Sequence, residues 1–342
     1  MNLLEFTDRG IHCPPGGFYI DPWQSVDYAV LTHAHADHAR RGSRHYLAHR
    51  DSEPVLRLRL GADIQLRTVD YGEEVRMNGV KVSLHPAGHI YGSAQVRVEH
   101  RGEVWVASGD YKLEDDGVSA PFEPVPCHSF VTESTFGLPI YQWKPPSVLM
   151  EEINGWWREN RDQGKASVLF GYSLGKAQRI LRHLDAGIGE VFLHGAIWNV
   201  HQALIEHGLS LPDAPKVTAE IAKRRYPGSL ILAPPSAAGT TWLRKFGAHA
   251  TGAASGWMNL RGAKRRKAVD RGFVVSDHAD WPGLNAAVAA TGASRVYVTH
   301  GYQAAFARYL RDRGLEAYEV NTLFEGESDE AGAMEALAGE GE

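Results

Sequence analysis

The chain has 342 residues, enough for one large or two medium domains, and its hydrophobic content of 43% provides for a full core. Only two cysteines occur, Cys13 and Cys127, which excludes a disulfide framework, and no apolar stretch reaches the length of a transmembrane helix. The N-terminus lacks the pattern of a secretory signal, so we expect a cytoplasmic protein without membrane contact.

The net charge of −5 does not by itself indicate a nucleic-acid-binding protein, but the charge is uneven. Residues 325–342 contain seven acids and no lysine or arginine, and their composition predicts a disordered or weakly helical tail. Basic clusters at 40–41, 223–225 and 264–267 leave room for a local phosphate-binding track. A solvated helix face is the simpler explanation of each single cluster.

Residues 1–140 are predicted to form short strands separated by glycines or charged turns. These strands span 17–21, 28–32, 80–87, 94–100, 103–110 and 129–135. Residues 147–255 alternate between helix and strand, which is typical of a parallel α/β unit. The helices are predicted at 147–162, 175–185 and 196–207, and the strands at 166–171, 191–194 and 229–233.

Residues 272–324 return to a strand–helix–strand pattern, with strands at 273–275 and 296–299 around a helix at 282–290. The sequence therefore predicts an α/β unit inserted into a strand-rich domain. We expect the first part of the host domain at 1–145, the inserted domain at 146–268, the second part of the host domain at 269–325, and an acidic tail at 326–342.

The run His33-Ala34-His35-Ala36-Asp37-His38 is the strongest chemical signal in the chain. It follows an apolar strand pattern at 26–32, so it lies on the loop where that strand ends. His33 and His35 are two residues apart and project on the same side of an extended chain. Three imidazoles and a carboxylate this close suit a borderline-soft divalent metal, and two ions better than one.

Further polar residues follow other predicted strands. His89 lies between two nearby glycines in 87–93, and Asp110 ends the strand at 103–110, where a lone carboxylate could bridge two cations. The remaining members are Glu133 in 131–135, His278 in 276–280 and His300 in 298–301. Each is a common capping or buried residue when taken alone, but together with the first run they indicate one site.

At residues 17–322 the chain resembles the metallo-β-lactamase superfamily, through H-x-H-x-D-H, the later G-H and then S-G-D. T-E-S-T-F-G, S-D-H-A-D and V-T-H-G resemble the three later motifs of its β-CASP branch of nucleic-acid hydrolases, as do segments 172–178 and 254–258. The resemblance implies an α/β fold, a metallo-β-lactamase αββα sandwich with an inserted β-CASP α/β domain.

The resemblance also implies residue roles. One zinc ion would be held by His33, His35 and His89, the other by Asp37, His38 and His300, and Asp110 would bridge them. Asp37 would belong to the catalytic centre as well, and Asp21 would orient the ligand loop. His278 matches the proposed general acid, with Glu133 holding it. The donor set fits zinc, although manganese or iron can occupy the same ligands.

The chemistry agrees with these roles. A hydroxide held between two divalent ions is available at neutral pH, the ions neutralise a phosphodiester, and an imidazole protonates the leaving sugar oxygen. In the inserted unit, Ser173 and Lys176 open a predicted helix, whose N-terminus could bind phosphate, and Ser255 and Gly256 could contact a terminal phosphate. An ordinary helix cap explains 173–178 equally well.

The compact size and the segments at 18–22, 32–43 and 171–179 are most similar to bacterial ligase-associated DNA exonucleases. That resemblance implies a 5′ to 3′ exonuclease on single-stranded DNA that acts in repair beside an ATP-dependent DNA ligase and a helicase. A β-CASP ribonuclease, favoured by His300, is the main alternative, with RNA as the substrate. A small-molecule hydrolase of the lactamase or glyoxalase kind would need neither the insertion nor the Glu133 and His278 pair.

Overall fold

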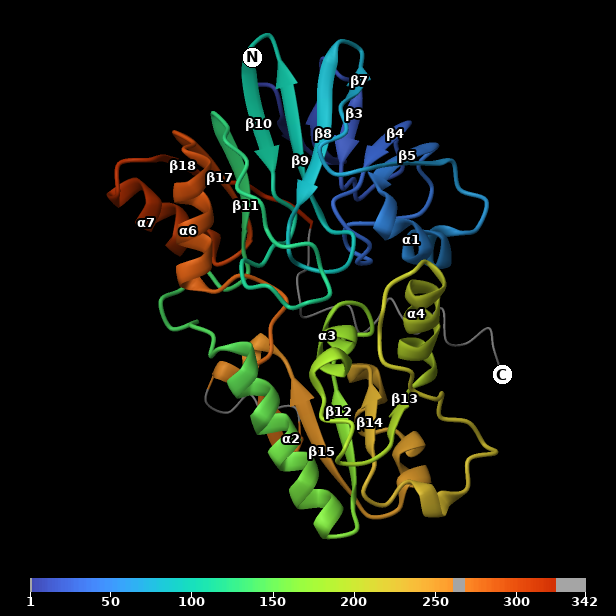
Figure 1. Ribbon diagram of the computed structural model, residues 1–342. Helices are drawn as coiled ribbons and strands as arrows, with labels where there is room; N and C mark the ends of the chain where they lie inside the picture. Colours follow the sequence, from blue (N-terminus) through green and yellow to red (C-terminus); the bar gives the residue numbers. More distant parts are fainter. Residues whose placement is uncertain (1, 261–267, 324–342) are drawn as a thin grey trace. The chain divides into compact units, whose positions relative to one another are not determined.

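The computed structural model describes residues 2–260 and 268–323 (Figure 1). These residues divide into two compact units. The first contains 2–142 and 278–323, and the second contains 143–260 and 268–277, so the second unit interrupts the first in the chain. Within the described ranges, no helix combines the length and the apolar character needed to cross a bilayer.

The first unit contains two sheets. The six-stranded sheet has the order β1-β2-β3-β4-β5-β6, and the seven-stranded sheet has the order β18-β17-β11-β10-β9-β8-β7. The strands of the first sheet are β1 (Glu5–Thr7), β2 (Gly10–Cys13), β3 (Phe18–Ile20), β4 (Tyr28–Val30), β5 (His45–His49) and β6 (Leu66–Val69). Those of the second are β7 (Val75–Met77), β8 (Val80–Pro86), β9 (Ala94–His100), β10 (Glu103–Ala107), β11 (Ser129–Ser134), β17 (Arg295–Gly301) and β18 (Glu316–Glu319).

The core of this unit lies between the two sheets. Val80, Val82 and Leu84 alternate along β8 and are completely buried, because successive side chains of a strand point to opposite faces. They pack with Val30 of β4 from the other sheet. Each such side chain stabilises the fold by roughly 1.5–3 kcal/mol through the apolar area that it removes from water.

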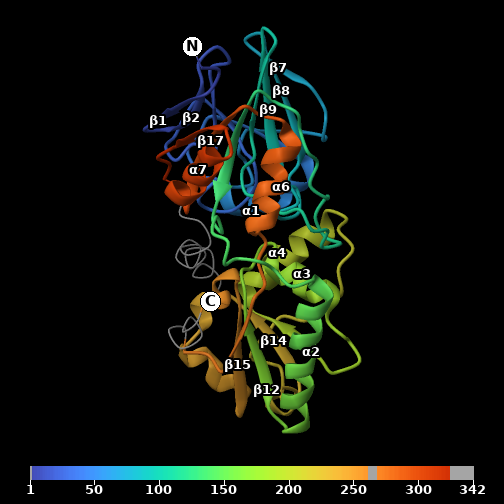
Figure 2. The same ribbon diagram turned by 90° about the vertical axis from the view of Figure 1, so that its left-hand side faces the viewer.

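Helices cover the outer faces. Leu284 of α6 (Trp281–Thr291) and Phe306 of α7 (Gln303–Asp312) join a second apolar cluster with Val296 and Val298 of β17, so both helices lie on the seven-stranded sheet (Figure 2). Helix α1 (Glu53–Leu60) follows β5 beside the six-stranded sheet. The layers are helix, sheet, sheet and helix, which confirms the predicted αββα sandwich.

The second unit contains one parallel sheet of the order β13-β14-β12-β15-β16, as the sequence predicted for this region. Its strands are β12 (Ala166–Phe170), β13 (Val191–Leu193), β14 (Leu230–Ala233), β15 (His249–Ala254) and β16 (Arg271–Phe273). Its helices are α2 (Pro146–Asp162), α3 (Lys176–His183) and α4 (Gly195–Glu206). Short 3-10 helices are η1 (Arg50–Ser52) in the first unit, and η2 (Lys223–Arg225), η3 (Pro235–Ala237), η4 (Thr241–Phe246) and η5 (Gly256–Asn259) in the second.

The second compact unit extends beyond residue 268, where we expect the inserted domain to end. In the structure β16 is hydrogen-bonded to β15, so the unit continues to Asp277. The sequence of β15, HATGAA, carries little strand signal, and its pairing with β16 is therefore not visible in the sequence. The basic cluster 264–267 and the tail 326–342 lie outside the described residues.

Candidate metal centre

The predicted metal ligands lie at strand ends of the first unit. His33, His35, Asp37 and His38 follow β4, and His89 follows β8. Asp110 follows β10, and His300 lies near the end of β17. Except for half-buried Asp37, these residues are buried, so the structure brings polar side chains from distant parts of the chain into one enclosed place.

One donor group consists of His33, His35, His89 and Asp110, whose donor atoms all lie within 4.8 Å of one another. His89 Nε2 is 3.1 Å from His35 Nδ1, and Asp110 Oδ2 is 3.6 Å from His33 Nε2 and 3.9 Å from His89 Nε2. Donors around a tetrahedral zinc ion lie about 3.4 Å apart, since each bond is about 2.1 Å long. The observed separations therefore fit a single ion.

A second donor group shares Asp110. His38 Nε2 lies 3.5 Å from Asp110 Oδ2 and 3.6 Å from Asp37 Oδ2. His300 Nε2 lies 3.1 Å from the other oxygen, Oδ1, of Asp110. Because the Asp110 carboxylate faces both groups, its position is compatible with bridging two cations.

Hydroxyl groups fix the imidazole tautomers. Thr32 Oγ1 donates to Asp21 Oδ2 at 2.5 Å and lies 2.9 Å from His33 Nδ1. A hydroxyl has one proton, so His33 Nδ1 must be the donor in the second contact, and its Nε2 carries a lone pair. Among the described residues this buried Nε2 has no hydrogen-bond partner, which is unusual for a buried polar atom and fits a metal ligand.

A threonine hydroxyl also lies beside the imidazole of His300 in β17. Thr299 Oγ1 donates to the carbonyl oxygen of Thr132 at 3.1 Å and lies 3.3 Å from His300 Nδ1. The Nδ1 side of the His300 ring therefore faces Thr299, and its Nε2 lies 3.1 Å from Asp110 Oδ1. The sequence analysis did not single out either threonine. The dipeptide Thr-His at both 32–33 and 299–300 was the signal that could have revealed them.

The carboxylate of Asp21 contacts both ends of the segment 32–38. Its carboxylate accepts hydrogen bonds from the backbone nitrogen of Thr32 at 2.8 Å and from His38 Nδ1 at 2.8 Å. Its backbone has φ of +42°, in the left-handed region that non-glycine residues rarely adopt. Because Nδ1 of His38 is bound here, its Nε2 is the nitrogen that faces Asp110.

Burial and neighbouring charge shift the acid–base equilibria of the cluster. Burial, with the charge of His38, holds the pKa of His33 well below its usual value. Burial also opposes protonation of His38, but the carboxylates of Asp37, Asp110 and Asp21 outweigh it and raise the pKa to about 10. Burial opposes ionisation of Asp110, yet His38, His278 and His300 hold its pKa well below the ordinary value.

The side chains of His278 and Glu133 are in contact. His278 Nδ1 lies 2.9 Å from Glu133 Oε2 and 3.1 Å from Glu133 Oε1, and both side chains are buried. The backbone nitrogen of Tyr111, the residue after Asp110, donates to Glu133 Oε1 at 2.8 Å. The rings of His278 and His89 have centroids 4.7 Å apart, so the acid pair lies next to the metal-ligand cluster.

The predicted nucleic-acid contacts belong to the second unit and are buried. Ser173 and Lys176 lie at the start of α3 and are 4% and 1% exposed, while Ser255 and Gly256 lie at the end of β15. Lys176 is engaged in an ion pair with Asp277. The basic residues at 223–225 are exposed, and Arg225 pairs with Glu190.

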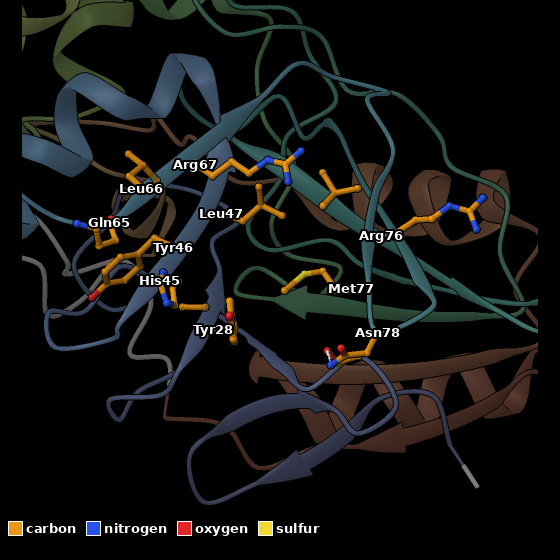
Figure 3. Close-up of a pocket in the computed structure, with 13 residues that line it drawn as sticks. Tyr28, His45, Tyr46, Leu47, Gln65, Leu66, Arg67, Arg76, Met77 and Asn78 are labelled. Atoms are coloured by element: carbon orange, nitrogen blue, oxygen red, sulfur yellow. Dashed lines mark hydrogen bonds between the residues drawn. The ribbon is translucent and has the colours of Figure 1, made fainter.

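A separate cavity of about 480 Å³ opens near the beginning of β4 (Figure 3). The Tyr28 and His45 rings stack there with centroids 4.8 Å apart. Arg67, Arg76 and Met77 also line the cavity. None of the predicted site residues lines it.

No known family model matches the chain, but similar proteins exist. It is 31% identical over 315 residues to a protein named Probable DNA ligase from Opitutus terrae, covering 91% of this chain and 30% of that protein. It is 28% identical over 152 residues to Endoribonuclease YSH1 from Yarrowia lipolytica, covering 44% of this chain and 17% of that protein. The third relative is Cleavage and polyadenylation specificity factor subunit 3-I from Arabidopsis thaliana, 25% identical over 222 residues, with coverages of 52% and 31%.

This chain spans less than a third of the length of each of these three relatives. A crystal structure described as a protein of unknown function from Enterococcus faecalis V583 superposes with a TM-score of 0.60 and 12% identity, covering 86% of this chain and 79% of that one. The structural likeness concerns the fold alone. Together, the αββα fold and the sequence similarities support a relationship of this chain to the metallo-β-lactamase superfamily and its β-CASP branch.

Proposed function

We propose that this chain is a metal-dependent nuclease, a 5′ to 3′ exonuclease on single-stranded DNA that acts in repair beside an ATP-dependent DNA ligase and a helicase. The observation that carries the hydrolytic part is the buried His278–Glu133 pair next to two donor groups that share Asp110. A proton donor beside a site for divalent cations is the arrangement that phosphodiester hydrolysis requires.

The donor set defines where the cations would bind. His33, His35 and His89 would hold one zinc ion, Asp37, His38 and His300 the other, and Asp110 would bridge them, with manganese as the alternative metal. When bound, the two ions would activate a water molecule and neutralise charge on the phosphodiester. Thr32, Thr299 and Asp21 keep the ligand nitrogens oriented through their hydrogen bonds.

The proton required by the leaving group comes from His278. As the water oxygen bonds to phosphorus, the water loses a proton to solvent. The bond between phosphorus and the leaving sugar oxygen breaks, and its electron pair stays on that oxygen. Nε2 of His278 donates its proton there, while Nδ1 keeps its hydrogen bond to Glu133. Glu133 is itself fixed by the Tyr111 amide, so the ring of the acid has a defined orientation.

The preference for DNA is supported by the relative from Opitutus terrae. The region of similarity covers most of this chain but less than a third of that protein, which is named a DNA ligase. A nuclease region joined to a ligase would prepare DNA ends for sealing, which agrees with action beside a ligase. We also propose that the second unit is the inserted β-CASP domain and that Ser173, Ser255 and Gly256 contact the nucleic acid.

A ribonuclease is the second candidate, supported by the relatives named endoribonuclease and by His300 in the ligand set. Both candidates share every ligand, so they differ only in substrate. Digestion of matched single-stranded DNA and RNA, each labelled at one end, distinguishes them in the presence of zinc or manganese. His33→Ala is the control for contaminating nucleases.

We expect stepwise release of nucleotides from the 5′ end of DNA and little cleavage of RNA. Faster cleavage of RNA would replace the DNA proposal with the ribonuclease, and internal cuts would overturn the exonuclease mode. Absence of cleavage of either polymer, with hydrolysis of a β-lactam or a thioester, would overturn the nuclease altogether.

A further inference from the structure

Two buried cations of α3 hold the segment that directly precedes His278 in the chain. Asp277 is the last residue of the second unit and is 2% exposed. Lys176 Nζ lies 3.6 Å from Asp277 Oδ2, and Arg179 Nη1 lies 3.6 Å from Asp277 Oδ1. Arg179 also donates a hydrogen bond to the carbonyl oxygen of Ser276. Both the side chain of Asp277 and the backbone before it are therefore held by α3.

The start of α3 is built to hold these two cations in place. Lys176 and Arg179 are three residues apart, so they lie on the same face of the helix. Gly175, with φ of +88°, forms the turn into the helix, and its backbone nitrogen donates to Gln178 Oε1 at 2.8 Å. Gln178 Nε2 in turn donates to the carbonyl oxygen of Ser173 at 3.0 Å. This closed set of bonds fixes the first turn.

Stability alone does not account for such a cluster. Transferring each ion from water to the interior costs several kcal/mol, and apolar residues of similar volume are often as stable as a buried ion pair. Lys176 and Arg179 are 1% and 2% exposed, so both charges are removed from water. What charged groups provide and apolar groups do not is directional fixing of one backbone conformation.

We propose that Lys176 and Arg179 are positioning residues that act through Asp277 on His278, a role that rests on the proposed function. Glu133 fixes the ring of His278 through Nδ1, and the ion cluster fixes the backbone from which His278 projects. Both restraints are needed because a displacement of about 1 Å at a reacting group can cost about 10²-fold in rate. In this role the ammonium of Lys176 faces Asp277, whereas the sequence suggested a phosphate contact for it.

The test distinguishes a loss of proton donation from a general loss of activity. It compares two substrates whose leaving groups differ in their need for a proton. Asp277→Asn keeps the size of the side chain and one carbonyl oxygen but removes the charge. Its rates are measured on end-labelled DNA, which needs a proton on the leaving oxygen, and on a nitrophenyl ester of thymidine phosphate, whose leaving group needs none. Arg182→Gln is the matched control, because Arg182 is an exposed cation on the same helix.

We expect Asp277→Asn to lower kcat on DNA about 10–100-fold and to change the nitrophenyl ester rate less than about threefold, with KM and metal content unchanged. Arg182→Gln should match the wild type on both substrates. In a His278→Ala background, Asp277→Asn should have no further effect on DNA cleavage, since the two residues act as one unit. Equal loss on both substrates, or additive loss with His278→Ala, would overturn the positioning role.

Arg179→Lys gives a second test that does not depend on Asp277→Asn being folded. Lysine keeps the charge but lacks the planar fork that reaches both Ser276 and Asp277, so a selective loss on DNA is again expected. Wild-type kinetics for a folded Arg179→Lys variant would overturn the role of Arg179. If the wild-type protein cleaved neither DNA nor the ester, the proposed function would fail instead, which is a different outcome from loss of selectivity.

Discussion

Asp110 in the first unit and Asp277 in the second are both buried carboxylates, but their partners differ in kind. Asp110 is 3% exposed and faces the ring nitrogens of His33, His38 and His300. Asp277 is 2% exposed and faces the ammonium of Lys176 and the guanidinium of Arg179. An imidazole can lose its proton and offer a lone pair, whereas a guanidinium has donors only.

This difference in partners indicates which of the two clusters requires bound cations. The cluster around Asp277 contains its own cations, Lys176 and Arg179. The cluster around Asp110 directs carboxylate oxygens and imidazole lone pairs towards one another, so divalent ions would complete it. The first cluster should therefore respond to metal and the second should not.

Removing a candidate metal ligand should have the largest effect on turnover. It tests whether the cluster around Asp110 depends on metal. His33→Ala should lose bound metal and lower turnover by about 10³-fold or more, because the ions provide several kcal/mol of charge stabilisation. Metal content by atomic absorption and DNA cleavage rates check this. His85→Gln is the control, since His85 lies in β8 shortly before His89 and pairs with Ser83 and Glu123. Full metal content in His33→Ala would remove this residue from the ligand set.

Removing the acid should leave the metal in place. His278→Ala is expected to lower turnover on DNA by about 10²-fold, the usual contribution of a general acid, without changing metal content. Glu133→Gln should give a smaller loss in the same direction, because the neutral amide still accepts a hydrogen bond from His278. A fall in metal content with His278→Ala would show that this imidazole is a ligand and not the acid.

Removing the carboxylate of the self-contained cluster should cost stability and not metal. Asp277→Ala removes the carboxylate that faces two buried cations and should lower the free energy of unfolding by about 3 kcal/mol. Glu190→Ala breaks the exposed pair with Arg225 and should cost less than about 1 kcal/mol. Urea unfolding of both variants measures the contrast. Similar losses would mean that the Asp277 cluster is solvated in solution.

The smallest expected effect concerns a half-buried histidine of the second unit. Burial, with the charges of Lys245 and Lys216, lowers the pKa of His194 to about 4, and its Nδ1 accepts a hydrogen bond from the Ala196 nitrogen. The unfolded state binds the proton more readily, so this contribution to stability is intact above about pH 6.5 and is lost as the pH falls towards 4.

His194→Asn keeps a capping acceptor but cannot titrate, so it should reduce the acid-induced loss of stability by on the order of 1 kcal/mol. Unfolding free energies of the wild type and the variant between pH 4 and 7 check this. Parallel pH profiles for the two proteins would contradict the pKa shift of His194.

Much of the candidate metal centre could be predicted, because most of its residues occur in short sequence motifs. The run at 33–38 contains three histidines and an aspartate, which are common metal ligands. Asp110, Glu133 and His300 each lie at or near the end of a recognisable strand. The supporting hydroxyls of Thr32 and Thr299 were overlooked because a threonine in a strand is usually explained by its strand propensity alone. Their importance follows only from the partners that accept their protons.

The sequence by itself determined the donor chemistry, the order of the ligands and the alternation that made the second unit a parallel sheet, because these depend on residue type and periodicity over short distances. Only the tertiary structure decided that Lys176 meets Asp277, about a hundred residues further along the chain, and that β16 belongs to the second unit. Pairings of that range leave no periodic trace in the sequence. They are selected by burial, which makes an uncompensated charge or an unpaired strand edge costly once the core has closed.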